Sequence, residues 1–154
     1  MIDQTETQIQ VQATVAAEQA ALFAVLADPA RHTEIDGSGM LQGAVESNAI
    51  TGSGQFFTMA MHYESLGDYR TVNEIVEFED GSRIGWTTAR EGNPPAGVRW
   101  TWELEPAGDG RTRVTHTYDW SRVEDPAVLA RVSFPRVKPA ELRATIDRLE
   151  RAAG

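Results

Sequence analysis

Three polar side chains lie on strand positions that are otherwise apolar, and they are the first candidates for chemistry. Glu74 shares its alternate positions with Val76, and His116 and Tyr118 share theirs with Trp120. A carboxylate and an imidazole on one desolvated face could act as a general acid–base pair, and a phenol could orient a ligand carbonyl or hydroxyl. Each also has a structural interpretation: an ion pair with a cavity-edge arginine such as Arg90, or a bulge, for the glutamate; a hydrogen-bonded core site for the histidine; and amphipathic filling for the tyrosine.

Other catalytic patterns are weak in this sequence or missing from it. His32 and Asp36 are four residues apart and could face one way, although a capping or surface role is favoured, and His62 falls on outward positions. The chain has no cysteine, and its three histidines lack the spacing of a zinc-binding helix. It has no phosphate-binding glycine loop and no nucleophilic-serine motif. We therefore expect no metal site and no cofactor.

Hydrophobic periodicity and turn residues indicate both strands and helices. Residues 8–13 alternate as a half-buried strand does, and the period becomes helical over 16–27. Asp28-Pro29 then suits the start of a short second helix, 29–35. The later strands are predicted at 40–45 (weak), 56–63, 69–78, 83–90, 98–104 and 111–120.

The second half of the chain predicts an antiparallel meander followed by helix. Short turns separate the successive strands, and such turns are typical of hairpins. Asp125-Pro126 suits a further helix start, and a final helix is expected over 139–152. Its apolar stripe is Leu142, Ile146 and Leu149. With no repeat or linker in sight, we expect a single α+β domain over residues 1–154.

The apolar parity of each strand predicts which side chains face the interior. Regular hairpins would give one row of Val76, Trp86, Trp100 and Tyr118 and a second row of Phe78, Ile84, Trp102 and His116. A single β-bulge would reverse these faces. The expected ligand-binding residues are Met59, Met61, Tyr63, Glu74, Val76, Trp86, Thr88, Trp100, Trp102, His116, Tyr118 and Trp120. Aromatic side chains with a few polar groups are more typical of a ligand pocket than of a filled core.

The composition is that of an acidic globular protein. The 154 residues are 41% hydrophobic and 24% charged, and the formal net charge is −9. This acidity argues against a nucleic-acid partner and against an anionic membrane surface. The longest apolar run, 20–27, is too short to span a bilayer, and the first residues lack the pattern of a signal peptide. We therefore expect no integral membrane segment and a cytoplasmic location.

The order of elements and three stretches of sequence resemble the SRPBCC superfamily, the START-like or polyketide cyclase/dehydrase group with the helix-grip fold. The stretches are 27–36, 99–106 and 110–117, and in the last Arg111 precedes the threonine of the usual Gly-Thr-Arg-Val type of sequence. The resemblance covers nearly the whole chain. It implies a curved antiparallel β-sheet wrapped around a long C-terminal helix, with two short helices after the first strand. It also implies that His32 and Asp36 border a cavity mouth.

Three functions are compatible with this resemblance. The favoured one is binding of a hydrophobic or aromatic small molecule, such as a lipid, an isoprenoid or a polyketide-like compound, in an internal cavity. The first alternative is a polyketide cyclase/dehydratase-type enzyme that uses Glu74 and His116 as acid–base residues in the same cavity. The second alternative is a protein-partner-binding module of the chaperone-activator kind, which predicts an exposed apolar patch and a filled core.

Overall fold

A single eight-stranded sheet forms the framework of the protein. The structure, a computed structural model, describes residues 1–46 and 48–154. The strands are β1 (Ile2–Gln4), β2 (Gln8–Val15), β3 (Leu41–Val45), β4 (Phe56–Tyr63), β5 (Gly67–Glu79), β6 (Arg83–Arg90), β7 (Val98–Pro106) and β8 (Thr112–Asp119). Their order is β1-β2-β8-β7-β6-β5-β4-β3, and every neighbouring pair is antiparallel. This order confirms the meander and shows that the N-terminal strands complete the sheet beside β8.

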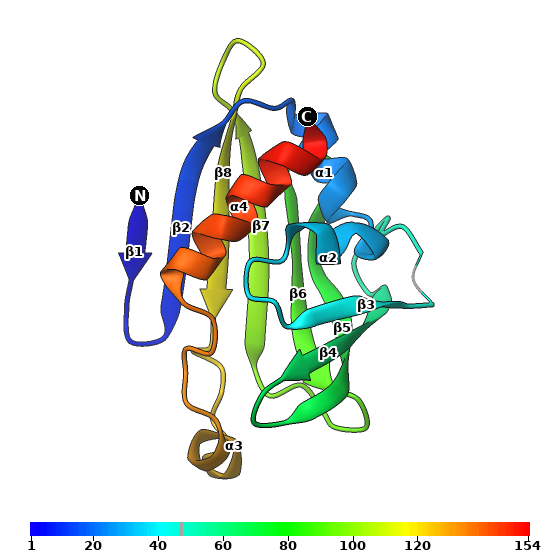
Figure 1. The fold of residues 1–154 in the computed structure, drawn as a ribbon, viewed down its shortest axis with the longest axis vertical. Helices are drawn as coiled ribbons and strands as arrows, with labels where there is room; N and C mark the ends of the chain where they lie inside the picture. Colours follow the sequence, from blue (N-terminus) through cyan, green and yellow to red (C-terminus); the bar gives the residue numbers. More distant parts are fainter. Residues whose placement is uncertain (47) are drawn as a thin grey trace.

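The helices lie mainly on one face of this sheet. They are α1 (Gln19–Leu26), the 3-10 turn η1 (Pro29–Arg31), α2 (His32–Ile35), α3 (Pro126–Arg131) and α4 (Pro139–Ala153). Figure 1 shows α4 crossing the sheet diagonally, with α1 and α2 beside it and α3 apart at one end. This arrangement confirms the predicted helix-grip architecture. No helix in the described ranges has both the length and the apolar character needed to cross a bilayer.

The C-terminal helix begins and packs as its sequence predicts. Pro139 is its first residue, and the backbone N–H of Lys138 donates to the Glu141 carboxylate (2.9 Å). Proline at the first position and a glutamate that returns to the cap are both favourable at a helix start. The buried residues of α4 are Leu142, Ile146 and Leu149. Burial of each such side chain contributes about 1.5–3 kcal/mol to stability, so this stripe fixes α4 on the sheet and on α1.

Gly37 brings the chain after α2 into close contact with α4. A Cβ atom at this position would clash with the carbonyl oxygen of Glu141 and would lie 2.9 Å from the Cβ of Ala144. The backbone N–H of Gly37 donates to the Thr145 hydroxyl (2.9 Å). The absence of a side chain therefore allows the segment that follows α2 to lie directly on α4.

A β-bulge in β5 changes which of its residues face the helices. The register with β6 shifts between Ile75 and Glu77, so Val76 is an extra residue in β5. Before the bulge, Asn73 and Ile75 are buried, whereas Glu74 pairs with Phe56, which is 60% exposed. The prediction that Glu74 and Val76 face the interior is therefore wrong, because the bulge reverses the parity on which it relied.

Beyond the bulge the predicted rows are present. Cross-strand pairs join Trp86 to Trp100 and Trp100 to Tyr118 in one row. The next row is made of Phe78, Ile84, Trp102 and His116. In the first row, Ile75 takes the place predicted for Val76. The strand β1 was not predicted, and all three of its residues are exposed.

Candidate functional site

A cavity of about 570 Å³ lies between the inner face of the sheet and the helices. Its wall includes side chains of β4 to β8, of α2 and α4, and of the segment that contains α3. A volume of this size is typical of small-molecule sites in proteins. The sheet-derived residues on the wall are Leu41, Phe57, Met59, Met61, Tyr69, Thr71, Asn73, Trp86, Thr88, Arg90, Val98, Trp100, Trp102, His116 and Tyr118.

Most of the residues predicted to bind a ligand lie on this wall. They are Met59, Met61, Trp86, Thr88, Trp100, Trp102, His116 and Tyr118. Contact between these residues and a ligand stays a prediction, but their common location is the one expected. Alternation along β4, β6, β7 and β8 placed them there correctly because these strands keep a regular register at the cavity.

Four predicted residues lie elsewhere. Glu74 and Val76 are displaced by the bulge. Trp120 is 7% exposed and packs in the core against Tyr118 (ring centroids 5.0 Å apart) rather than on the cavity wall. Tyr63 ends β4, and the guanidinium of Arg136 lies over its ring, 5.2 Å from the centroid. These positions correct the predicted lining at its two ends.

Stacked aromatic rings make up the floor of the cavity. Trp100 and Tyr118 are parallel, with centroids 4.1 Å apart and an interplanar angle of 3°. Trp102 and His116 stack at 3.6 Å and 10°. Direct cross-strand pairing places these side chains over one another, and each aromatic pair adds about 0.5–1.5 kcal/mol beyond the burial of its area. The floor is therefore a rigid, flat and polarisable surface.

His116 is buried on this floor without full hydrogen bonding. Its side chain is 4% exposed, and its Nδ1 has no hydrogen-bond partner among the described residues. Desolvation lowers the pKa of His116 to about 3, so the imidazole is neutral at physiological pH. An unpaired polar atom in such a site costs about 1–3 kcal/mol. The ring of His116 lines the cavity, but its Nδ1 is enclosed by protein atoms, so a ligand would meet the ring rather than this nitrogen.

His32 closes the opposite side of the cavity and has a structural hydrogen bond. Its Nε2 lies 2.8 Å from the carbonyl oxygen of Leu26. A carbonyl can only accept, so Nε2 carries the proton. The ring stacks on Trp86 at 5.2 Å and meets Phe57 edge-on, and burial lowers the pKa of His32. His32 is therefore a neutral wall residue that ties α2 to the floor.

Asp36 also lies on the cavity wall, where it has a capping role. Its carboxylate accepts from the backbone N–H of Ser38 (2.9 Å) and of Leu41 (3.0 Å). These bonds hold the turn between α2 and β3. The structure thus favours the capping interpretation of this residue.

Tyr118 joins the floor to the chain that leads into α4. Its hydroxyl accepts from the backbone N–H of Arg136 (3.3 Å), and burial raises the pKa of Tyr118 to about 12. The phenol therefore stays protonated at any physiological pH. Its own proton remains available to an acceptor in the cavity.

A polar group that the sequence reasoning missed lies on the β5 wall. Asn73 is 3% exposed, its Nδ2 donates to the Phe57 carbonyl (3.4 Å), and its Oδ1 accepts from the Thr88 hydroxyl (2.8 Å). Gly85 was the available signal, since a glycine inside a strand often marks a bulge. It pairs with Glu77 at the register shift, where a Cβ would lie 3.0 Å from the Glu77 carboxylate.

The cavity does not bring together the predicted acid–base pair. Glu74 faces away from His116, and the two carboxylates among the described wall residues, Asp36 and Asp125, both accept from backbone amides. Within the same ranges, no group of three histidine or acidic side chains could hold a metal ion. The wall is thus suited to binding and orienting a molecule through aromatic surface and a few neutral polar groups.

Comparison with known proteins identifies the family. Residues 6–154 match the family described as polyketide cyclase/dehydrase and lipid transport. An uncharacterised protein of Mycobacterium tuberculosis, Rv0088, is 37% identical over 106 residues, which are 69% of this chain and 44% of that protein. The chain therefore spans less than half the length of the curated relatives it matches.

Solved structures share the fold at low sequence identity. Protein Ms6760 from Mycobacterium smegmatis has a TM-score of 0.68 at 15% identity, covering 98% of this chain and 94% of its own. A major latex-like protein from Panax ginseng has a TM-score of 0.60 at 11% identity, covering 94% and 95% of the two chains. The family description names cyclase, dehydrase and lipid transport roles, and the solved structures show the fold alone. The chain belongs to the polyketide cyclase/dehydrase and lipid transport family of the SRPBCC superfamily.

Proposed function

We propose that this protein binds a hydrophobic or aromatic small molecule, such as a lipid, an isoprenoid or a polyketide-like compound, in the cavity over β4 to β8. The observation that carries the proposal is the cavity of about 570 Å³ with its aromatic floor, on which Trp100 stacks on Tyr118 and Trp102 on His116. Burial of apolar ligand surface there would contribute about 25 cal/mol of favourable binding free energy per Å². His116, Tyr118 and the Asn73–Thr88 pair would fix the orientation of the ligand's polar groups.

The lining also explains why binding is proposed ahead of catalysis. A cyclase-type reaction needs a group that can exchange a proton near neutral pH. Burial lowers the pKa of His116 to about 3, and Glu74 lies on the other face of the sheet. The chaperone-activator alternative predicts a filled core, and the cavity of about 570 Å³ argues against that alternative.

The test is a binding screen read by tryptophan fluorescence and native mass spectrometry. Trp86, Trp100 and Trp102 lie on the wall, so a ligand that enters should change the emission of the purified protein and add its mass to the complex. The panel should contain fatty acids, linear isoprenoids and fused-ring polyphenols. A complete lack of bound mass and of spectral change across the panel would reject the proposal.

Two matched variants connect binding to the cavity. His116→Phe keeps a flat ring over Trp102 but removes the ring nitrogens, so it should weaken ligands that have a hydrogen-bonding group by roughly five- to tenfold. Glu74→Gln changes the outer face and should bind as the unaltered protein does. Equal weakening by both variants would show that the effect is not local to the cavity.

A further inference from the structure

Three arginines lie on the cavity wall without a carboxylate partner. Arg90, Arg131 and Arg136 all line the cavity. None of them forms a salt bridge with any described carboxylate, although the chain has 23 acidic and 14 basic residues. On the outer face, by contrast, the single residue Arg83 forms salt bridges with three carboxylates, those of Glu77, Glu79 and Glu103. Three guanidinium groups without a salt bridge therefore lie on the cavity wall, in a protein rich in possible partners.

Two of these arginines converge on one tyrosine from different parts of the chain. Tyr69 is on β5 and lines the cavity, and the guanidinium of Arg90, at the end of β6, lies 5.5 Å from the centroid of its ring. Arg136, in the segment between α3 and α4, is close enough that its positive charge acts on the same phenol. Burial raises the pKa of Tyr69, and the charges of Arg136 and Arg90 partly oppose that rise. The two cations therefore share one corner of the cavity.

The acidic residues of the wall do not neutralise this corner. Asp36 accepts from Ser38 and Leu41, and Asp125 accepts from the backbone N–H of Ala127 (2.9 Å) at the start of α3. Both carboxylates are therefore already engaged by backbone amides. The guanidinium groups of Arg90 and Arg136 have aromatic rings beside them and retain donors for an anion.

We propose that the ligand is amphipathic, with an apolar body over Trp100 and Trp102 and an oxyanion, a carboxylate or a phosphate, held by Arg90 and Arg136. This inference rests on the proposed function and specifies the ligand class. Arginine suits the role because its planar fork matches both oxyanions. The charge pattern also explains how an acidic protein can accept an anion: the positive charges are local and lie beside the apolar floor.

A pair of fluorescent probes tests the charge requirement. Anilinonaphthalene sulfonate and the neutral N-phenyl-1-naphthylamine share the same aromatic body, and only the first carries an anion. The full chain should bind the anionic probe roughly tenfold more tightly than the neutral one. Arg90→Gln and Arg136→Gln should each reduce this ratio, and the double variant should bring it close to one without changing the affinity for the neutral probe.

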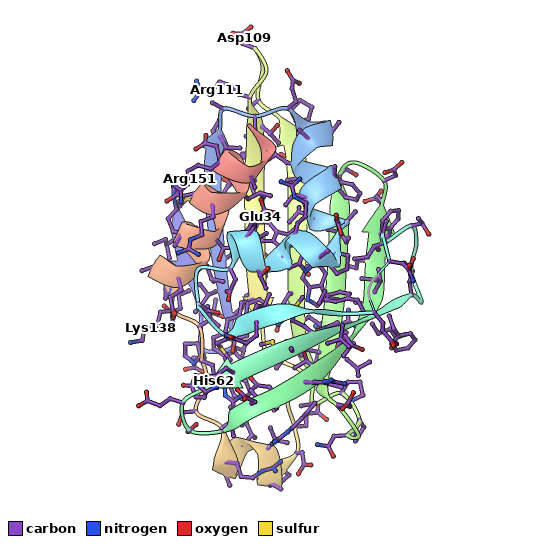
Figure 2. The ribbon with its side chains drawn as sticks, turned by 45° about the vertical axis from the view of Figure 1, so that its right-hand side comes forward. Glu34, His62, Asp109, Arg111, Lys138 and Arg151 are labelled. Atoms are coloured by element: carbon purple, nitrogen blue, oxygen red, sulfur yellow. The ribbon has the colours of Figure 1, made fainter. Side chains whose placement is uncertain are left out.

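Arg151→Gln is the matched control. Arg151 is exposed near the C-terminal end of α4, toward the end of the molecule opposite α3 (Figures 1 and 2). Its loss removes one positive charge without touching the cavity, so the ratio should stay at the unaltered value. Thermal unfolding of each variant checks that the fold is retained.

The outcomes separate this inference from the proposed function. Equal affinity for the two probes, or a ratio that survives in the double variant, would overturn the anion site while leaving hydrophobic binding in place. Binding of neither probe would overturn both. Displacement by a long-chain fatty acid or by an alkyl phosphate, but not by the methyl ester of that fatty acid, supports the site and identifies the oxyanion. Displacement by the ester as strong as by the acid would count against it.

Discussion

The imidazole of His116 lies flat against Trp102 and is buried. It therefore lacks the water that hydrogen-bonds to an exposed histidine. Its neutral form is the one that the cavity favours, since burial lowers its pKa to about 3. A neutral histidine has one ring nitrogen that donates and one that accepts, and the tautomer decides which is which. It can therefore adapt to a ligand hydroxyl or carbonyl without bringing a charge into the apolar floor.

The same burial makes His116 a source of acid sensitivity. Its folded-state pKa lies below the ordinary value of 6.5, so the unfolded chain binds more protons between about pH 3 and 6.5. The contribution of the neutral ring to stability is complete above about pH 6.5 and is lost as the pH falls. We expect the unaltered protein to lose about 2 kcal/mol more than His116→Phe between pH 7 and pH 5, measured by urea unfolding.

A control separates this effect from general acid destabilisation. His62 is on the outward side of β4, where its Nδ1 lies 2.8 Å from the Asp68 carboxylate (Figure 2). The variant His62→Gln should retain the full acid loss because His116 is still present. If His116→Phe shows the same loss as the unaltered protein, the ring is protonated in the folded state.

At the scale of elements, the bulge in β5 makes the cavity wall different from the one that alternation predicts. It turns Asn73 inward and Glu74 outward. Asn73→Ala should lower the free energy of unfolding by about 2 kcal/mol, because the Thr88 hydroxyl and the Phe57 carbonyl would lose a buried partner. Glu74→Ala, the matched change on the next residue, should cost less than about 0.5 kcal/mol. Chemical denaturation that gave the reverse order would contradict the bulge.

The contact between Gly37 and α4 gives a second prediction at this scale. In Gly37→Ala the added methyl group would meet the carbonyl oxygen of Glu141, so either the turn or α4 must move. We expect a loss of about 1–3 kcal/mol in the free energy of unfolding, as for other overpacked sites. Gly52→Ala is the control, since nothing lies within 4 Å of a Cβ there. An unchanged stability in Gly37→Ala would mean that α2 is free to shift away from α4.

The sequence was sufficient for every strand except β1 and for most of the cavity floor, for physical reasons that particular residues show. The bounds of β4 and β6 were predicted, and Trp100, Trp102, His116 and Tyr118 were placed correctly, since regular pairing makes alternation a reliable guide. The bulge was missed because one extra residue leaves the hydrophobicity of a strand unchanged.

The rim of the cavity was beyond the reach of periodicity. Arg136 follows α3 and lies on no repeating pattern, and Arg90 was expected at the cavity edge only as a partner of Glu74, not beside Tyr69. Such pairs depend on how the chain between α3 and α4 folds back over the sheet. Even so, the aspartates at 36 and 125 read correctly as a turn-capping residue and a helix start.

For the molecule as a whole, a cavity in the core means that binding and stability are linked. A ligand that binds only the folded state should add about 2.7 kcal/mol to the free energy of unfolding when present at a hundred times its dissociation constant. The measurement is urea unfolding with and without a compound identified by the fluorescence screen. A spectral change without added stability would indicate binding at the surface or to unfolded chains.

The two borders of the sheet, β1 and β3, do not pair with each other among the described residues, so the strands do not close on themselves as they would in a barrel. In a barrel, strand number and stagger dictate the diameter. Here α2, α4 and the segment that contains α3 line the cavity opposite the strands, so the depth of the cavity depends on where these elements lie. Substitutions on those helices should therefore change the size of ligand that the cavity accepts, while the hydrogen bonds between the strands stay unchanged.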